Sequence, residues 1–85
     1  MKLDDRVKEL IAIGASITAN CQPCLQYHVG KGLESGADEQ EITEAIEVGK
    51  MVRRGAASKM DKFASSVNAA LPSPAGVSTE GCGCG

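Results

Sequence analysis

Apolar residues recur at intervals of three and four positions through most of the chain, which is the spacing of one face of an α-helix. The first run covers residues 2–19 and is interrupted at Asn20 or Cys21, because Asn favours caps and turns. A second run follows, with Pro23 in its first turn, where the missing N–H costs nothing, and Gly36 as its C-cap. The pattern therefore predicts two helices joined by a short turn.

A third helix is predicted to begin at Asp38. Asp38 and Glu41 have the spacing of a capping box, in which each side chain accepts a hydrogen bond from the other residue's backbone N–H. Its expected buried stripe consists of Ile42, Ala45, Ile46, Gly49, Val52 and Ala56. The pattern leaves open whether a helix ends at Gly55 or continues through it. Arg53 and Arg54 are interpreted as solvated cations at a helix end.

The composition changes after Leu71. Residues 72–85 are rich in Pro, Gly and Ser, so we expect a flexible tail there. Residues 1–71 are then one helical domain, since a chain of 85 residues holds one domain at most. No convincing strand alternation is present, and the predicted fold class is all-α.

The expected core is made of small side chains, because the chain has one Phe, one Tyr and no Trp. Each small side chain removes little apolar area from water, at about 25 cal/mol per Å². We therefore expect the subunits of an oligomer to share a core.

The net charge of −2 gives no basic field for nucleic acid and argues against binding to anionic membranes. The most apolar stretch, residues 10–19, is too short to span a bilayer and lacks the layout of a signal peptide. We therefore expect no nucleic-acid partner, no membrane partner and a cytoplasmic location. In the cytoplasm, a close pair of cysteines is usually catalytic or metal-binding.

The candidate chemistry begins with Cys21 and Cys24, at the start of the second predicted helix. Their spacing brings the two sulfurs onto one face, close enough for a disulfide. A helix N-terminus also favours the thiolate, which is the reactive form of cysteine. The same spacing fits half of a zinc site, so both readings stay open.

His28 shares a helical stripe with both cysteines, and it is the chain's single histidine. An imidazole can take a proton from a thiol or return it to a leaving thiolate. The alternative is a histidine that is satisfied structurally in a helix interface. A zinc site would lack a fourth ligand within the helices, and Cys82 or Cys84 would have to supply it.

Cys82 and Cys84 lie between glycines in the predicted tail. Three interpretations are open for them: an inert exposed segment, a tethered auxiliary dithiol that exchanges with the helix disulfide, or a ligand pair for a soft metal or an arsenical.

Glu9, the pair Cys21 and Cys24, and His28 four residues after the second cysteine resemble the AhpD-like (alkylhydroperoxidase-like) branch of the carboxymuconolactone decarboxylase family. The resemblance covers residues 3–63 and includes the Gly-Ala-Asp-x-x-Glu-Ile segment that starts at Gly36. It implies antiparallel helices that assemble into homo-trimers or homo-hexamers. It also implies a cysteine pair that cycles between dithiol and disulfide, with His28 and Glu9 as a proton relay.

One position departs from that pattern. AhpD itself has a second histidine directly before the second cysteine, and Pro23 stands there in this chain. A Cys-x-Pro-Cys segment is similar instead to thioredoxin-type centres, which favours disulfide exchange over fast peroxide reduction.

Two function hypotheses follow. The first is an enzyme, a disulfide reductase or alkylhydroperoxidase-like peroxidase, whose substrate is a disulfide or a peroxide. The chain shows no flavin or nicotinamide motif, so no cofactor is expected and electrons come from an external thiol or a protein reductant. The second is a metal- or metalloid-binding module that uses Cys21, Cys24 and the tail cysteines. The sequence leaves open which cysteine is the nucleophile.

Overall fold

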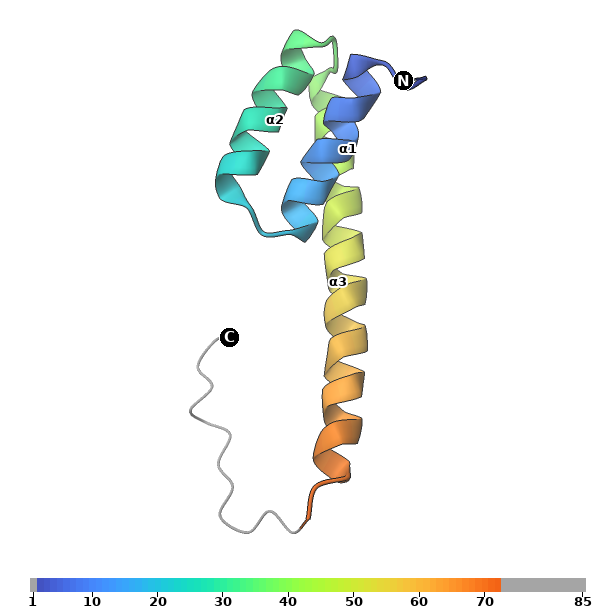
Figure 1. Ribbon diagram of the computed structural model, residues 1–85. Helices are drawn as coiled ribbons and strands as arrows, with labels where there is room; N and C mark the ends of the chain where they lie inside the picture. Colours follow the sequence, from blue (N-terminus) through green and yellow to red (C-terminus); the bar gives the residue numbers. More distant parts are fainter. Residues whose placement is uncertain (1, 73–85) are drawn as a thin grey trace.

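The computed structural model describes residues 2–72, and the predicted tail with Cys82 and Cys84 lies outside these residues apart from Pro72. The described chain forms three helices and no strand: α1 (Asp5–Thr18), α2 (Gln22–Glu34) and α3 (Glu39–Ala69) (Figure 1). The all-α prediction is confirmed.

Consecutive helices run in opposite directions, so α1 and α3 point the same way (Figure 1). Helix α1 packs against both of the others, whereas α2 and α3 have few contacts with each other. The core has few residues and no aromatic side chain: its buried apolar residues are Ile13, Ala37 and Ile42. Partly buried side chains surround it, namely Leu10, Leu25, Val29, Ala45 and Ile46.

Glycines allow α1 and α3 to pack with their backbones close together. A Cβ atom on Gly49 would lie 2.5 Å from the carbonyl oxygen of Gly14, closer than side-chain atoms can approach. The hydroxyl of Thr18 donates a hydrogen bond across the contact to the Gly49 carbonyl, at 3.1 Å. The backbones of α1 and α3 are therefore in direct contact at this point, and there is no room for a side chain at Gly49.

The ends of α2 and α3 follow the sequence signals. Gly36 has a φ of +96°, and the Ala37 N–H bonds the Gly32 carbonyl at 2.9 Å, which is the Schellman arrangement. The predicted capping box at the start of α3 is also confirmed, with Asp38 and Glu41 each accepting the other's backbone N–H.

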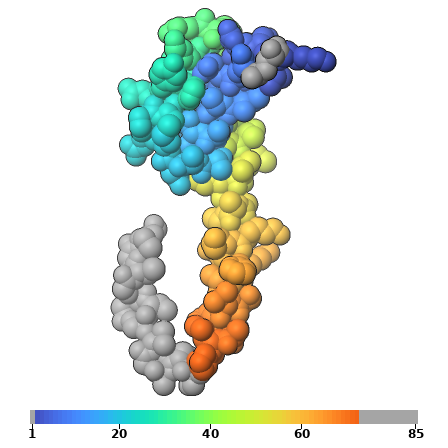
Figure 2. Space-filling model, in the orientation of Figure 1, coloured from blue at the N-terminus to red at the C-terminus, as the bar shows by residue number. Residues whose placement is uncertain are grey.

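Helix α3 does not end at Gly55 but continues to Ala69. Every residue from 54 to 72 is exposed, because α3 extends past the other two helices (Figures 1 and 2). Ala56, which was expected to be buried, is exposed for the same reason, and Val52 is exposed because it lines an open groove between α1 and α3. Arg53 and Arg54 lie within a helix rather than at its end. Within residues 2–72, no helix combines the length and the apolar character needed to cross a membrane.

Candidate active site

The turn between α1 and α2 places Cys21 at the start of α2. Asn20 adopts a φ of +56°, in the left-handed region that Asn tolerates better than most residues. The N–H of Asn20 bonds the Ile17 carbonyl at 3.1 Å, and the N–H of Cys21 bonds the Ser16 carbonyl at 3.0 Å. Cys21 therefore completes the C-terminal cap of α1 and is also the N-cap residue of α2.

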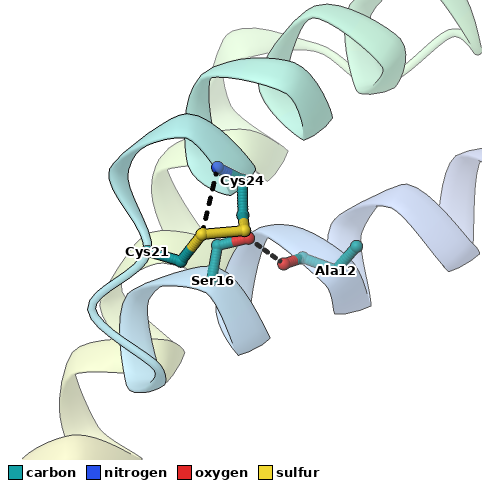
Figure 3. The surroundings of a disulfide bond; sticks show 4 residues. All are labelled: Ala12, Ser16, Cys21 and Cys24. Atoms are coloured by element: carbon teal, nitrogen blue, oxygen red, sulfur yellow. Dashed lines mark hydrogen bonds between the residues drawn. A yellow bond between two sulfur atoms is a disulfide. The ribbon is translucent and has the colours of Figure 1, made fainter.

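Cys21 and Cys24 form a disulfide, with their Cα atoms 5.2 Å apart (Figure 3). The backbone N–H of Cys24 donates to the sulfur of Cys21 at 3.3 Å, so this sulfur occupies the place of an N-cap acceptor. A sulfur in this position receives the positive end of the helix dipole, which favours the thiolate once the bond is reduced. The bond lies within one helix start, so opening it separates no helices.

Ser16 of α1 lies beside the disulfide (Figure 3). It is the one buried polar residue in the described part of the chain, and its hydroxyl donates to the Ala12 carbonyl at 2.7 Å. Sequence reasoning assigned Ser16 no part in the site, because a serine within an apolar helical run carries no distinctive signal.

Glu9 and His28 are brought together from different helices. Oε1 of Glu9 on α1 lies 2.6 Å from Nδ1 of His28 on α2, and both side chains are about one quarter exposed, at 23% and 29%. Gly32 of α2 is buried against α1 beside this pair, and a Cβ at its position would lie 3.8 Å from the Cβ of Glu9, an ordinary packing distance.

The Glu9–His28 contact determines which imidazole nitrogen is available for proton transfer. An ionised carboxylate only accepts hydrogen bonds, so Nδ1 carries the hydrogen and Nε2 has the free lone pair. His28 is one turn after Cys24 along α2, but no hydrogen bond within residues 2–72 joins it to either sulfur of the oxidised form.

A small open pocket of about 170 Å³ adjoins the disulfide. Its lining includes Asn20 and Cys21 of the turn and Arg53 of α3. Nη1 of Arg53 donates to the side-chain oxygen of Asn20 at 2.9 Å and to the Ile17 carbonyl at 3.3 Å. Sequence reasoning missed this role of Arg53, because Asn20 is distant in the chain and no local pattern signals the contact.

Within the described part of the chain, no group of three or more His, Cys, Asp or Glu side chains is arranged to hold a metal ion. The tail cysteines of the metal-binding hypothesis, Cys82 and Cys84, lie outside that part.

Comparison with known proteins places these residues in a family. Residues 1–65 match the model of the carboxymuconolactone decarboxylase family. "Uncharacterized protein 4 in cox locus" from Paracoccus denitrificans is 40% identical over 55 residues, which cover 65% of this chain. The match spans 50% of that protein's own length. No solved structure matches the chain. The family match extends from the first helix past the disulfide and into α3, and the chain belongs to the carboxymuconolactone decarboxylase family.

Proposed function

We propose that the protein is a thiol–disulfide oxidoreductase of the AhpD-like type, with Cys21 and Cys24 as its redox pair. The observation that carries the proposal is the disulfide at the start of α2, together with the hydrogen-bonded contact between Glu9 on α1 and His28 on α2. A bond confined to one helix start can open and close while the packing of the helices is kept.

The reaction is a pair of thiol–disulfide exchanges. In the reduced protein, one cysteine thiolate attacks a substrate disulfide, forms a mixed disulfide and releases the first substrate thiol. The second cysteine then attacks the mixed disulfide, releases the second substrate thiol and closes the Cys21–Cys24 bond. An external dithiol or protein reductant returns the pair to the dithiol and is itself oxidised to a disulfide. Two electrons are transferred in each half of the cycle.

His28 and Glu9 serve the proton transfers of these steps. Nε2 of His28 accepts the proton of the attacking thiol, directly or through water, and returns it to the leaving thiolate. Glu9 holds Nδ1, fixes the tautomer and stabilises the imidazolium that forms. The structural alternative, a histidine satisfied in a helix interface, predicts that loss of Glu9 or His28 changes stability and leaves the exchange rate intact.

The same dithiol can reduce a peroxide, with the peroxide converted to an alcohol and water while the disulfide closes. Pro23 favours disulfide exchange as the main activity, because it occupies the position where AhpD has a second histidine. We place this activity in the cytoplasm, where external thiols supply electrons.

We further propose that the working form is a homo-trimer or homo-hexamer. The outer part of α3 exposes Met60 and Phe63, each at 64%, and Val67 at 46%. These residues continue the apolar stripe of Ile42 and Gly49, and helical spacing puts them on one face. An open apolar groove of about 450 Å³ also runs between α1 and α3, at the inner end of this face.

The proposal is tested by a redox titration of the purified chain against dithiothreitol buffers, read by mass after alkylation. The expected result is a reversible transition of two electrons at Cys21 and Cys24. The reduced protein should also convert hydroxyethyl disulfide to free thiols. A pair that stays reduced under mild diamide, or reduced protein that transfers no electrons to a disulfide, would contradict the proposal.

A further inference from the structure

We propose that the pocket between Cys21 and Arg53 is a substrate subsite for a carboxylate, and that the preferred substrates are small disulfides bearing a carboxylate near the sulfur. This inference rests on the proposed function and adds the substrate class and the residue that selects it. Nothing in the carboxymuconolactone decarboxylase match or in the matched relative assigns a role to Arg53.

The position of the pocket is the first argument. Cys21 lines it and Cys24 does not, so a molecule in the pocket lies against Cys21 rather than Cys24. At about 170 Å³ it is smaller than the usual sites for whole ligands, which measure about 300–1,000 Å³. The pocket therefore fits one arm of a disulfide substrate, while the other arm remains in solvent as the leaving group.

The charge of the pocket is the second argument. Among the residues that the structure describes, Arg53 is the single charged residue that lines it, and no acidic residue is part of its lining. Within residues 2–72, Arg53 forms no ion pair with a carboxylate. Its Nη1 is engaged by Asn20 and Ile17, whereas Nη2 and Nε donate to no group in the described chain. An unpaired guanidinium with free donors matches a carboxylate better than any neutral group.

The fixed position of Arg53 is the third argument. Its hydrogen bond to Asn20 ties the guanidinium to the same turn that positions Cys21, so cation and sulfur are held relative to each other. A carboxylate that binds Arg53 within this pocket would hold its own arm of the disulfide in the space that Cys21 also lines. Cys21 then forms the mixed disulfide with the bound arm, the other arm leaves as a thiol, and Cys24 closes the protein disulfide to release the bound arm.

The test is a single-turnover assay with the fully reduced chain and three disulfides of similar size. Dithiodipropionate carries carboxylates, hydroxyethyl disulfide is neutral, and cystamine carries ammonium groups. Each rate constant is divided by the rate constant of dithiothreitol with the same disulfide, which removes the intrinsic difference in reactivity. The natural chain should prefer the carboxylate over the neutral disulfide by about five- to tenfold, the value of a partly exposed charge-assisted hydrogen bond, and cystamine should be slowest.

Arg53→Gln should abolish this preference, so that the normalised rates of the three disulfides become equal within about twofold of one another, whatever the overall rate of the variant. Arg54→Gln is the matched control, because Arg54 is the next residue, is exposed and does not line the pocket. Arg54→Gln should keep the same ranking of normalised rates, with the carboxylate disulfide fastest and cystamine slowest. Arg53→Lys keeps the positive charge but not the planar guanidinium group. The carboxylate disulfide should therefore still react fastest, but by a smaller factor than in the natural chain. Added salt should weaken the preference of the natural chain.

Equal normalised rates for the three disulfides in the natural chain would overturn the subsite, whatever the folding of the variants. A preference that persists in Arg53→Gln would overturn the assignment to Arg53. Failure of the reduced chain to transfer electrons to any of the three would instead contradict the proposed function, so the two failures are distinguishable.

Discussion

Glu9 and His28 each lie one helical turn before a buried residue of their own helix, Ile13 and Gly32, and these two buried residues pack against each other. The contact between Glu9 and His28 thus lies one turn from a packed contact between α1 and α2. Its geometry is fixed by the core and not by the side chains alone, which is a requirement for a proton relay that works without reorganisation.

Replacement of either member of this pair should slow disulfide exchange at neutral pH. General acid–base assistance is typically worth about 10²–10⁴-fold, and His28→Ala and Glu9→Gln should both lose a large part of it. The measurement is the second-order rate of the reduced chain with hydroxyethyl disulfide, together with thermal unfolding. Glu34→Gln is the control, since Glu34 is on α2 with a side chain that is 71% exposed. If the rate constant falls by less than about threefold in both His28→Ala and Glu9→Gln, neither residue takes part in the proton relay.

The disulfide should form reversibly and without loss of the fold. Mild oxidation should remove two hydrogens from the peptide that contains Cys21 and Cys24, and circular dichroism should be nearly unchanged, because the bond joins residues with a sequence separation of 3 at one helix start. Alkylation followed by peptide mass analysis makes the measurement. Oxidation mapped instead to Cys82 or Cys84 would contradict the assignment of the redox pair.

Gly49→Ala should destabilise the chain strongly. Its new Cβ would lie 2.5 Å from the Gly14 carbonyl oxygen and 2.8 Å from the Cβ of Ile17, so α1 and α3 must move apart. Overpacking of this kind costs about 1–3 kcal/mol of unfolding free energy. Gly55→Ala is the control on the same helix, since a Cβ there meets no atom within 4 Å. It should stabilise the helix by about 0.5–1 kcal/mol.

Urea denaturation of the two variants makes the comparison. Equal changes in unfolding free energy for Gly49→Ala and Gly55→Ala would mean that α1 and α3 are not in close backbone contact.

A charge in the exposed apolar face of α3 should dissociate the assembly. Phe63→Asp places a carboxylate on the stripe of Met60 and Val67, where burial between subunits would leave it unpaired. Ser65→Asp is the matched control, because helical spacing puts Ser65 on the opposite side of α3. Light scattering should give a multiple of 8.8 kDa for the natural chain and for Ser65→Asp, and a lower mass for Phe63→Asp. A natural chain near 8.8 kDa at micromolar concentration would contradict the oligomer.

Local signals in the sequence were sufficient for most of the fold. The capping box of Asp38 and Glu41, the turn at Gly36 and the position of Pro23 are each determined within a few residues, and the structure has all of them. Gly55 could not be decided this way. A glycine costs a helix only about 1 kcal/mol, and the apolar stripe continues on both sides of it.

Contacts between helices were harder to predict. The meeting of Glu9 with His28 was expected only through the family resemblance, since a glutamate on an amphipathic helix is usually solvated. The contact of Arg53 with Asn20 was not expected at all. Periodicity shows which face of a helix is apolar, but it does not show what covers that face, and so Val52 was predicted as buried although it is 54% exposed.

In the proposed oligomer, the projection of α3 beyond its neighbours should make its helicity dependent on protein concentration. The segment after Gly55 has no tertiary contact within the described chain to stabilise it, and isolated helices of this length are marginal in water. Amide hydrogens of residues 56–69 should therefore exchange quickly at high dilution and slowly once a second subunit covers Phe63. Hydrogen exchange along this one helix then reports the state of assembly residue by residue, while protection of the α1–α2 contact stays constant.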